Sequence, residues 1–250
     1  MKPTGILSVI AVCAVASLFG CSLSNFPVSH PLLAQSGTSY ELTTEFPQSP
    51  AIAAVYEVTG KESFTIGSER LMDPKTDTPS VDEAPSLALK ALEGYGGLPE
   101  DAVLHLVEKV YLNKYDVKTG INEPVAPQWT LVIFEQEVQG NPVIGPGAEI
   151  WVALGENGGL LQLDKVWRTV KYQTDVPIIT SQEAFSRLSK GEMLIPIQSG
   201  LGSVTINKIK LGYYAEDRKY EQKQYKPVWI FYGKDSQNND VRLPVMATES

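Results

Sequence analysis

The sequence predicts an α+β fold built from two helix-on-antiparallel-sheet units in tandem, because two patterns repeat along the chain. A segment that opens a helix occurs twice, and a strand centred on tryptophan also occurs twice, each pair at an offset of 100 residues. Within each copy the apolar positions change from helical to alternating spacing. Two unrelated segments that share common start signals are the alternative. The matched segments are Ser80–Ala84 with Thr180–Ala184, and Gln128–Phe134 with Val228–Tyr232.

The N-terminus has the layout of a secretory signal. Lys2 precedes an apolar stretch, Ile6–Ala16, and the run Leu18–Cys21 (LFGC) follows it. A cysteine directly after glycine at this place resembles the lipobox of bacterial and archaeal lipoproteins, which implies cleavage before Cys21 and lipid on its thiol. A soluble form cut after Ala16, or an uncut anchor of about 17 residues against the usual ~20, are the alternatives.

All three interpretations place residues 22–250 outside the cytoplasm, and the lipobox implies a lipid-anchored protein on the extracytoplasmic face of the cell membrane. We assign residues 1–20 to the signal peptide. Residues 21–50, rich in Ser, Thr, Pro and Gln, are expected to form a flexible tether with a root-mean-square span of roughly 30 Å. Cys13 would leave with the signal and Cys21 would carry lipid, so no intramolecular disulfide is expected.

The charge of the chain limits its partners. The net charge is −8, and loss of Lys2 with the signal makes it one unit more negative. An acidic chain without a Lys/Arg cluster argues against nucleic acid as partner. It also argues against docking of the folded part on an anionic lipid surface. Lipid on Cys21 is therefore the expected contact with the membrane.

The first unit is expected over residues 51–175. Ile52–Val58 (IAAVYEV) favours a strand, and Thr59–Lys61 favours a turn. Pro99–Leu112 is ambiguous between helix and strand, and the β-branched residues of the matching segment in the second unit favour a strand. Short turns then predict an antiparallel meander. Its strands are expected over residues 129–138, 143–154 and 160–169.

Each unit is expected to begin with a helix. In the first, Pro85 fits only the first turn, so Asp82 is the better N-cap, and Gly94 ends the helix. In the second, Thr180 and Glu183 predict a capping box, in which hydroxyl and carboxylate each accept from a free backbone N–H. The second unit, over residues 176–250, then continues with strands expected over 204–211, 226–232 and 240–246.

The run Gln136-x-x-x-Gly140-x-Pro142-Val143, with Glu149–Ala153 and Asn157–Gly159 after it, resembles the PepSY and thermolysin-propeptide type of domain. The resemblance implies a cystatin-like helix-on-sheet unit. Two such units behind a membrane anchor resemble the YycH/YycI type of extracytoplasmic regulator, which binds a sensor kinase. Members of these families act by binding as propeptides, inhibitors or regulators, so the resemblance implies no catalytic residue.

The residues themselves suggest no catalytic or metal site. His30 falls in the expected tether and His105 stands alone in an apolar segment, whereas zinc needs three or four converging ligands. Ser199–Gly202 is glycine-rich but lacks the Gly-Lys-Ser/Thr of a phosphate loop. Glu135 and Glu137 point to one face of a strand, and a solvated face explains them better than a glycosidase pair. We expect no metal, no cofactor and no enzymatic activity.

Two of the four tryptophans, Trp129 and Trp229, are the candidate partner-binding residues. Aromatic side chains on an open sheet face often anchor a partner, although packing in the core is the alternative for strand tryptophans. The strand 226–232 is apolar on both alternations, so it is either covered on both faces or a binding edge.

These observations lead to one functional hypothesis and one alternative. The hypothesis is a membrane-anchored, non-catalytic lipoprotein that binds a protein in the envelope, such as a protease or the outer part of a sensor kinase. The alternative is a carrier of a small ligand or lipid in a pocket between helix and sheet.

Overall fold

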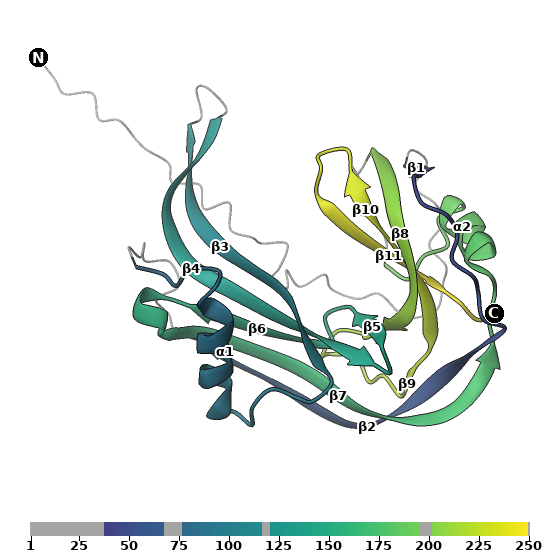
Figure 1. Cartoon of the computed structure of the whole chain (residues 1–250), viewed down its shortest axis with the longest axis horizontal. Coiled ribbons are helices and arrows are strands. Elements are labelled where there is room, and N and C mark those ends of the chain that lie inside the picture. Colours follow the sequence, from purple (N-terminus) through teal and green to yellow (C-terminus); the bar gives the residue numbers. More distant parts are fainter. Residues whose placement is uncertain (1–37, 68–76, 117–120, 196–201, 250) are drawn as a thin grey trace, which may run out of the picture.

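The computed structural model describes residues 38–67, 77–116, 121–195 and 202–249 (Figure 1). The expected signal peptide and the lipidation site Cys21 lie outside these residues. Within the described ranges, no helix is both long enough and apolar enough to cross a membrane.

The described strands form a single curled sheet (Figure 1). Nine of them follow the path β11-β10-β8-β5-β4-β6-β7-β2-β9, while β1 joins β8 and β3 joins β4. The sheet resembles a half-open barrel, with the β3–β4 hairpin at one end and β8, β10 and β11 at the other. The bounds are β1 Ser39–Leu42, β2 Ile52–Gly67, β3 Ala102–Asp116, β4 Ile121–Val138, β5 Asn141–Ile144, β6 Glu149–Leu154, β7 Leu160–Pro177, β8 Ser203–Tyr214, β9 Gln224–Tyr225, β10 Pro227–Asp235 and β11 Asp240–Met246.

The prediction of two helix-on-sheet units in tandem is wrong. The described chain is mostly β, with two α-helices, and its strands do not separate into two sheets. The short strand β5 is the physical reason, because it pairs antiparallel with β4 and parallel with β8. It thereby connects the segments that the sequence assigned to different units.

Pairing also extends further than the turn signals suggested. Strand β2 continues through Thr59, where a register shift against β7 marks a bulge in place of the expected turn. The ambiguous segment after Pro99 is a strand, β3. Residues expected in the tether are also part of the fold, since β1 pairs in parallel with β8 from Ser39 to Leu42.

The two helices cover different parts of the sheet. Helix α1, Ala84–Glu93, packs against β4, β6 and β7 through buried Ala84, Ala88 and Leu92. Helix α2, Ser181–Ser189, packs against β8, β10 and β11 through buried Ala184 and Leu188. Each helix therefore supports its own apolar core on the one continuous sheet.

The start of α2 agrees with the prediction and the start of α1 does not. At α2, the Thr180 hydroxyl accepts from the Glu183 N–H, and the Glu183 carboxylate accepts from the Thr180 N–H, so the capping box is confirmed. Before α1, Ser80 and Glu83 make the same exchange in place of the expected cap by Asp82. This capping box therefore precedes the first residue of α1, Ala84, and lies about one turn ahead of the helix.

A third apolar cluster lies where the two parts of the sheet meet. Tyr56 of β2, Val143 of β5, Tyr213 of β8 and Tyr225 of β9 are its principal members. The fully buried Gln136 side chain connects neighbouring strands there, since its amide donates to the Arg168 carbonyl oxygen over 2.8 Å and its oxygen accepts from the Tyr225 hydroxyl over 3.0 Å. This junction fixes the ends of β2, β4 and β7 relative to one another.

Candidate functional site

Three features of the described residues are candidates for function: a network of charges inside the curl, the free edge of β3, and a cavity beside Tyr56. The charge network centres on Glu135 of β4, which is 6% exposed. Its carboxylate accepts from the Arg242 guanidinium of β11 and lies 3.2 Å from His105 Nδ1 of β3. The strand pattern predicts a solvated face for Glu135, and its burial corrects that prediction.

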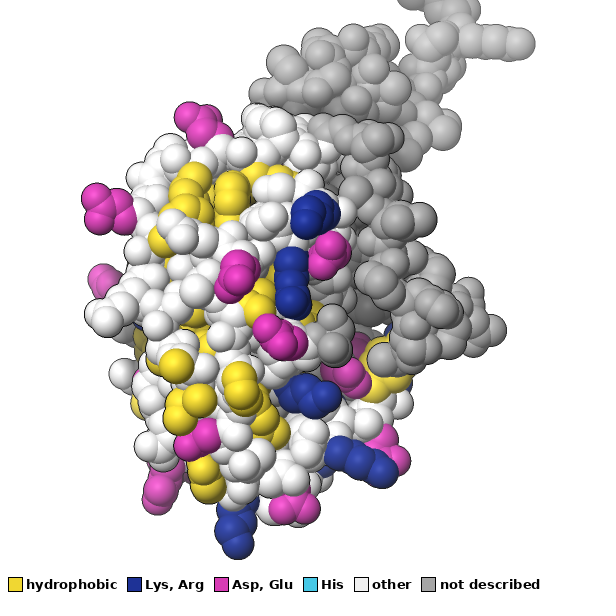
Figure 2. Space-filling model, turned by 90° about the vertical axis from the view of Figure 1, so that its right-hand side faces the viewer, with side chains coloured by type: hydrophobic (Ala, Val, Ile, Leu, Met, Phe, Trp, Pro, Cys, Tyr) yellow, Lys and Arg dark blue, Asp and Glu magenta, His cyan; other side chains and the backbone are white. Residues whose placement is uncertain are grey.

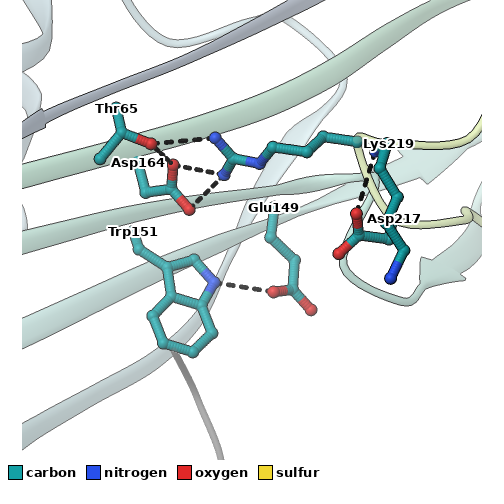
Figure 3. A network of polar contacts seen from close by, with 7 residues as sticks. Thr65, Glu149, Trp151, Asp164, Asp217 and Lys219 are labelled. Carbon is teal, nitrogen blue, oxygen red and sulfur yellow. Dashed lines mark hydrogen bonds and ion pairs between the residues drawn. The ribbon is translucent and has the colours of Figure 1, made fainter. Parts of the chain in front are cut away.

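Glu149 of β6 extends this network. Its Oε2 accepts from the Trp151 indole N–H over 2.7 Å (Figure 3). Its Oε1 lies 4.0 Å from Arg242 Nη2. Burial raises the pKa of Glu149 from 4.5 to about 7, and the indole hydrogen bond opposes part of that rise. One acid with a pKa near neutrality therefore lies beside an ion pair that is largely enclosed.

A second polar group lies close by. The Arg218 guanidinium contacts both carboxylate oxygens of Asp164 and donates to Thr65 Oγ1 over 2.9 Å (Figure 3). The Asp217 carboxylate accepts from the Lys219 N–H over 2.9 Å in the same loop. These contacts bind the loop after β8 to β2 and β7.

The network joins segments that are far apart in the sequence. In it Glu135 and Asp164 each pair with an arginine. No group of three His, Cys, Asp or Glu side chains that could hold a metal ion occurs among the residues that the structure describes. No local pattern predicts the Glu135–Arg242 contact, because its partners are 107 residues apart.

The outer edge of β3 is the second feature. Strand β3 pairs with β4, and no described strand pairs with its other edge. Large apolar side chains are exposed along it, namely Val103 (42%), Leu104 (50%), Leu106 (37%) and Tyr111 (46%). A long strand with free backbone N–H and C=O groups and apolar side chains favours pairing with another extended chain.

The third feature is a cavity of about 490 Å³ at the ends of β2, β4 and β7. Its aromatic walls are Tyr56 and Tyr172, whose ring centroids lie 6.3 Å apart at 84°. Its acidic lining residues are Asp101 and Glu137. Val138, Gln139 and Val170 complete the lining.

The two candidate tryptophans do not form one site. Trp229 is 1% exposed, its indole donates to the Ile179 carbonyl oxygen over 2.9 Å, and it belongs to the core under α2. The structure therefore places Trp229 in the core, which was the alternative interpretation of the strand tryptophans. Trp129 is half-buried on β4, opposite Val110 of β3.

Charged side chains of both signs occur on the surface. On the face shown in Figure 2, basic and acidic side chains are interspersed with apolar areas.

Comparison with known proteins gives no family for this chain. No family model matches the sequence, and no curated protein gives a significant match. A similar solved structure is the crystal structure of an uncharacterised protein from Eubacterium rectale ATCC 33656. It has a TM-score of 0.35 and 16% identity, and the alignment covers 71% of this chain and 55% of that protein.

The resemblance to PepSY, thermolysin-propeptide and YycH/YycI domains is therefore wrong. No family model supports it, and a curled, strand-rich sheet replaces the expected units. Some of the residues that carried the resemblance lie in turns between strands: Gly140, Asn157 and Gly158 have φ of 77°, 55° and 72°. Such turn residues recur in unrelated hairpins, which explains the false match.

Proposed function

We propose that the mature chain is a membrane-tethered, extracytoplasmic and non-catalytic protein-binding module, whose edge strand β3 receives an extended segment of a protein partner. The observation that carries the proposal is the edge of β3 with which no described strand pairs, together with its four exposed apolar side chains. Unpaired backbone groups in this spacing match the backbone of another strand. Lipid on Cys21 would hold the module at the membrane surface.

The occupant is a strand rather than a helix because of the shape of the edge. The side chains of β3 alternate between the two faces of the sheet, and exposed apolar residues occur on both, at Val103 and Leu104. A helix would cover one face and leave the backbone groups unpaired. An extended segment with apolar residues on both of its faces would satisfy the backbone and bury the side chains together.

Site-specific cross-linking in the native envelope tests this proposal. Leu104→Cys, Leu106→Cys and Tyr111→Cys, each labelled with a photoreactive maleimide, place the probe along β3. We expect adducts with one protein, and the cross-linked residue in that protein should move in step as the probe moves along the strand. Leu89→Cys on α1, which is 43% exposed, is the matched control and should give no such adduct.

Two results would contradict the proposal. Cross-linked positions that do not shift with the probe would exclude a strand as the occupant. Adducts with a second copy of this chain would replace the partner protein by self-association. Leu104→Lys and Leu106→Lys should abolish the adduct formed from Tyr111→Cys without unfolding the protein, since both leucines are exposed.

The anchor is tested separately. Mass spectrometry of the mature N-terminus should find lipid on Cys21, and Cys21→Ala should release the protein from washed membranes. An unlipidated mature chain that begins elsewhere would overturn the anchor and leave the role of β3 open to its own test.

A further inference from the structure

The cavity beside Tyr56 has a lining unlike the rest of the polar interior. Asp101 and Glu137 supply two carboxylates, and none of the described residues that line the cavity is a lysine or arginine. Buried or half-buried carboxylates elsewhere in the curl, such as Glu135 and Asp164, face an arginine. The negative charge of this cavity is therefore left without an internal counterion.

Neutral groups hold the Asp101 carboxylate in place. Asp101 Oδ1 accepts from the Trp167 indole over 3.1 Å and Oδ2 accepts from the Gln136 amide over 2.6 Å. The Glu137 N–H donates to the Asp101 carbonyl oxygen over 2.8 Å, which fixes the two residues side by side. Among the described residues the Glu137 carboxylate has no hydrogen-bond or ion-pair partner of its own.

Two tyrosine rings form the apolar part of the cavity. Tyr56 is 8% exposed and fixed by a perpendicular contact with Tyr213, whose ring centroid is 5.3 Å away. Tyr172, 55% exposed, stands at 84° to Tyr56. The two rings meet edge to face, and Tyr172 is the more exposed of them. The face of an aromatic ring carries negative electrostatic potential, which attracts an organic cation.

We infer that this cavity binds the alkylammonium group of an organic cation, with Tyr56 and Tyr172 against its apolar surface and Asp101 and Glu137 supplying the opposite charge. The combination selects against two other ligand classes. Anions are repelled by the carboxylates, and a neutral molecule of the same shape gains the ring contact without the charge attraction. A hydrated metal ion would gain little from the tyrosine rings, which favour a weakly hydrated cation. The inference is independent of β3 and of the protein partner.

Isothermal titration of the purified full chain with choline and with 3,3-dimethylbutanol, its neutral isostere, tests the inference. We expect saturable choline binding in the micromolar to millimolar range that weakens as salt is raised, and much weaker binding of the isostere. Tyr172→Leu should weaken choline binding roughly two- to fivefold, whereas Tyr172→Phe retains the ring and should retain most of the affinity.

Charge variants complete the test. Glu137→Gln should weaken choline binding, again by roughly two- to fivefold for a partly exposed charge, while Glu93→Gln at the exposed end of α1 should leave it unchanged. The inference is overturned if choline does not bind, if the isostere binds equally well, or if Glu137→Gln and Glu93→Gln behave alike. Competition by phosphatidylcholine vesicles would assign the cation to a lipid headgroup, and its absence would assign it to a soluble amine.

Discussion

At the scale of single residues, burial determines how the charged side chains behave. The pKa of Glu149 is raised from 4.5 to about 7 in the folded protein. Between these two pH values the folded protein holds a proton on Glu149 that the unfolded chain has released. Stability from this group is complete below about pH 4.5 and is lost as the pH rises through about 7. The groups that face it include Glu135, Asp164, Arg242 and the Trp151 indole.

Glu149→Gln should remove this pH dependence. Glutamine still accepts from the Trp151 indole, so the variant should match the wild type in mildly acidic solution and exceed its free energy of unfolding in alkaline solution by up to roughly 3 kcal/mol. Urea unfolding at a series of pH values measures the difference. Glu156→Gln, on an exposed turn, is the control, and equal pH profiles for both variants would refute the role of Glu149.

Arg168 is a buried cation whose surroundings are built to accept its charge. It is 1% exposed, and its guanidinium donates to the carbonyl oxygens of Gly147, over 2.7 Å, and of Asp217. Residue 147 must be glycine, because a Cβ there would lie 1.9 Å from Arg168 Nη1. The guanidinium therefore fills space that the backbone leaves for it.

Arg168→Ala should destabilise the fold by about 3 kcal/mol, because buried carbonyl groups lose their donors and a cavity is left. Chemical denaturation measures the loss. The neighbouring Lys171→Ala, exposed on the same strand, should cost less than about 0.5 kcal/mol. Similar costs for the two variants would mean that the carbonyl contacts of Arg168 contribute little.

At the scale of elements, the sequence predicts best what local chemistry decides. The capping box of α2 was predictable because all of its groups lie within four residues, from Thr180 to Glu183. Strand β11 also begins and ends where the alternation of apolar residues indicated. The continuation of β2 through Thr59 could not be predicted in this way. Only pairing with β7 determines that the chain continues there as a bulged strand and does not turn.

The Trp129–Trp229 match failed for a reason specific to strands. Side chains along a strand alternate between the two faces of the sheet. Two strand residues are therefore equivalent only if both point to the face that carries the helix, or both point away from it. Phe134 of β4 faces α1 and Trp229 of β10 faces α2, but Trp129 has the parity of Glu135 and faces the other side. An identical offset in sequence thus places the two tryptophans on non-equivalent faces.

The capping box of α2 allows a quantitative test. Thr180→Ala removes the acceptor for the Glu183 N–H and should lower the free energy of unfolding by about 1 kcal/mol. Thr180→Ser keeps the hydroxyl and should cost far less. Thermal or urea unfolding compares the two, and equal losses would show that the threonine methyl group, rather than the cap, is what matters.

At the scale of the whole molecule, the two parts of the sheet share little backbone pairing. Strand β5 contributes two residue pairs to β4 and two to β8. Strand β9 adds two residue pairs with β2. Side chains supply further contacts, including the tyrosine cluster, Arg168, and the ion pair between Glu135 and Arg242. These contacts join distant segments, which is why neither the single sheet nor the charge network could be predicted from local patterns.

The Glu135–Arg242 contact should therefore hold the curl closed. Arg242→Met alone leaves Glu135 buried beside Glu149 and should cost about 3 kcal/mol. In a double-mutant cycle with Glu135→Gln, the coupling free energy should be well above the roughly 0.2–1 kcal/mol of exposed pairs. The exposed pair Lys234–Asp240 within the β10–β11 hairpin is the matched control.

The control separates closure of the curl from ordinary surface attraction. Lys234 and Asp240 lie 2.9 Å apart on adjacent strands, with side chains 40% and 84% exposed, so salt should screen their coupling. Arg242 and Glu135 join strands that are not neighbours in the sheet, and the Glu135 side chain is 8% exposed. Coupling that persists at high salt for Arg242–Glu135 alone would identify the pair as a fastening between the two ends of the sheet. Equal, salt-sensitive coupling for both pairs would mean that the curl is held by its apolar junction around Tyr56 and Tyr213.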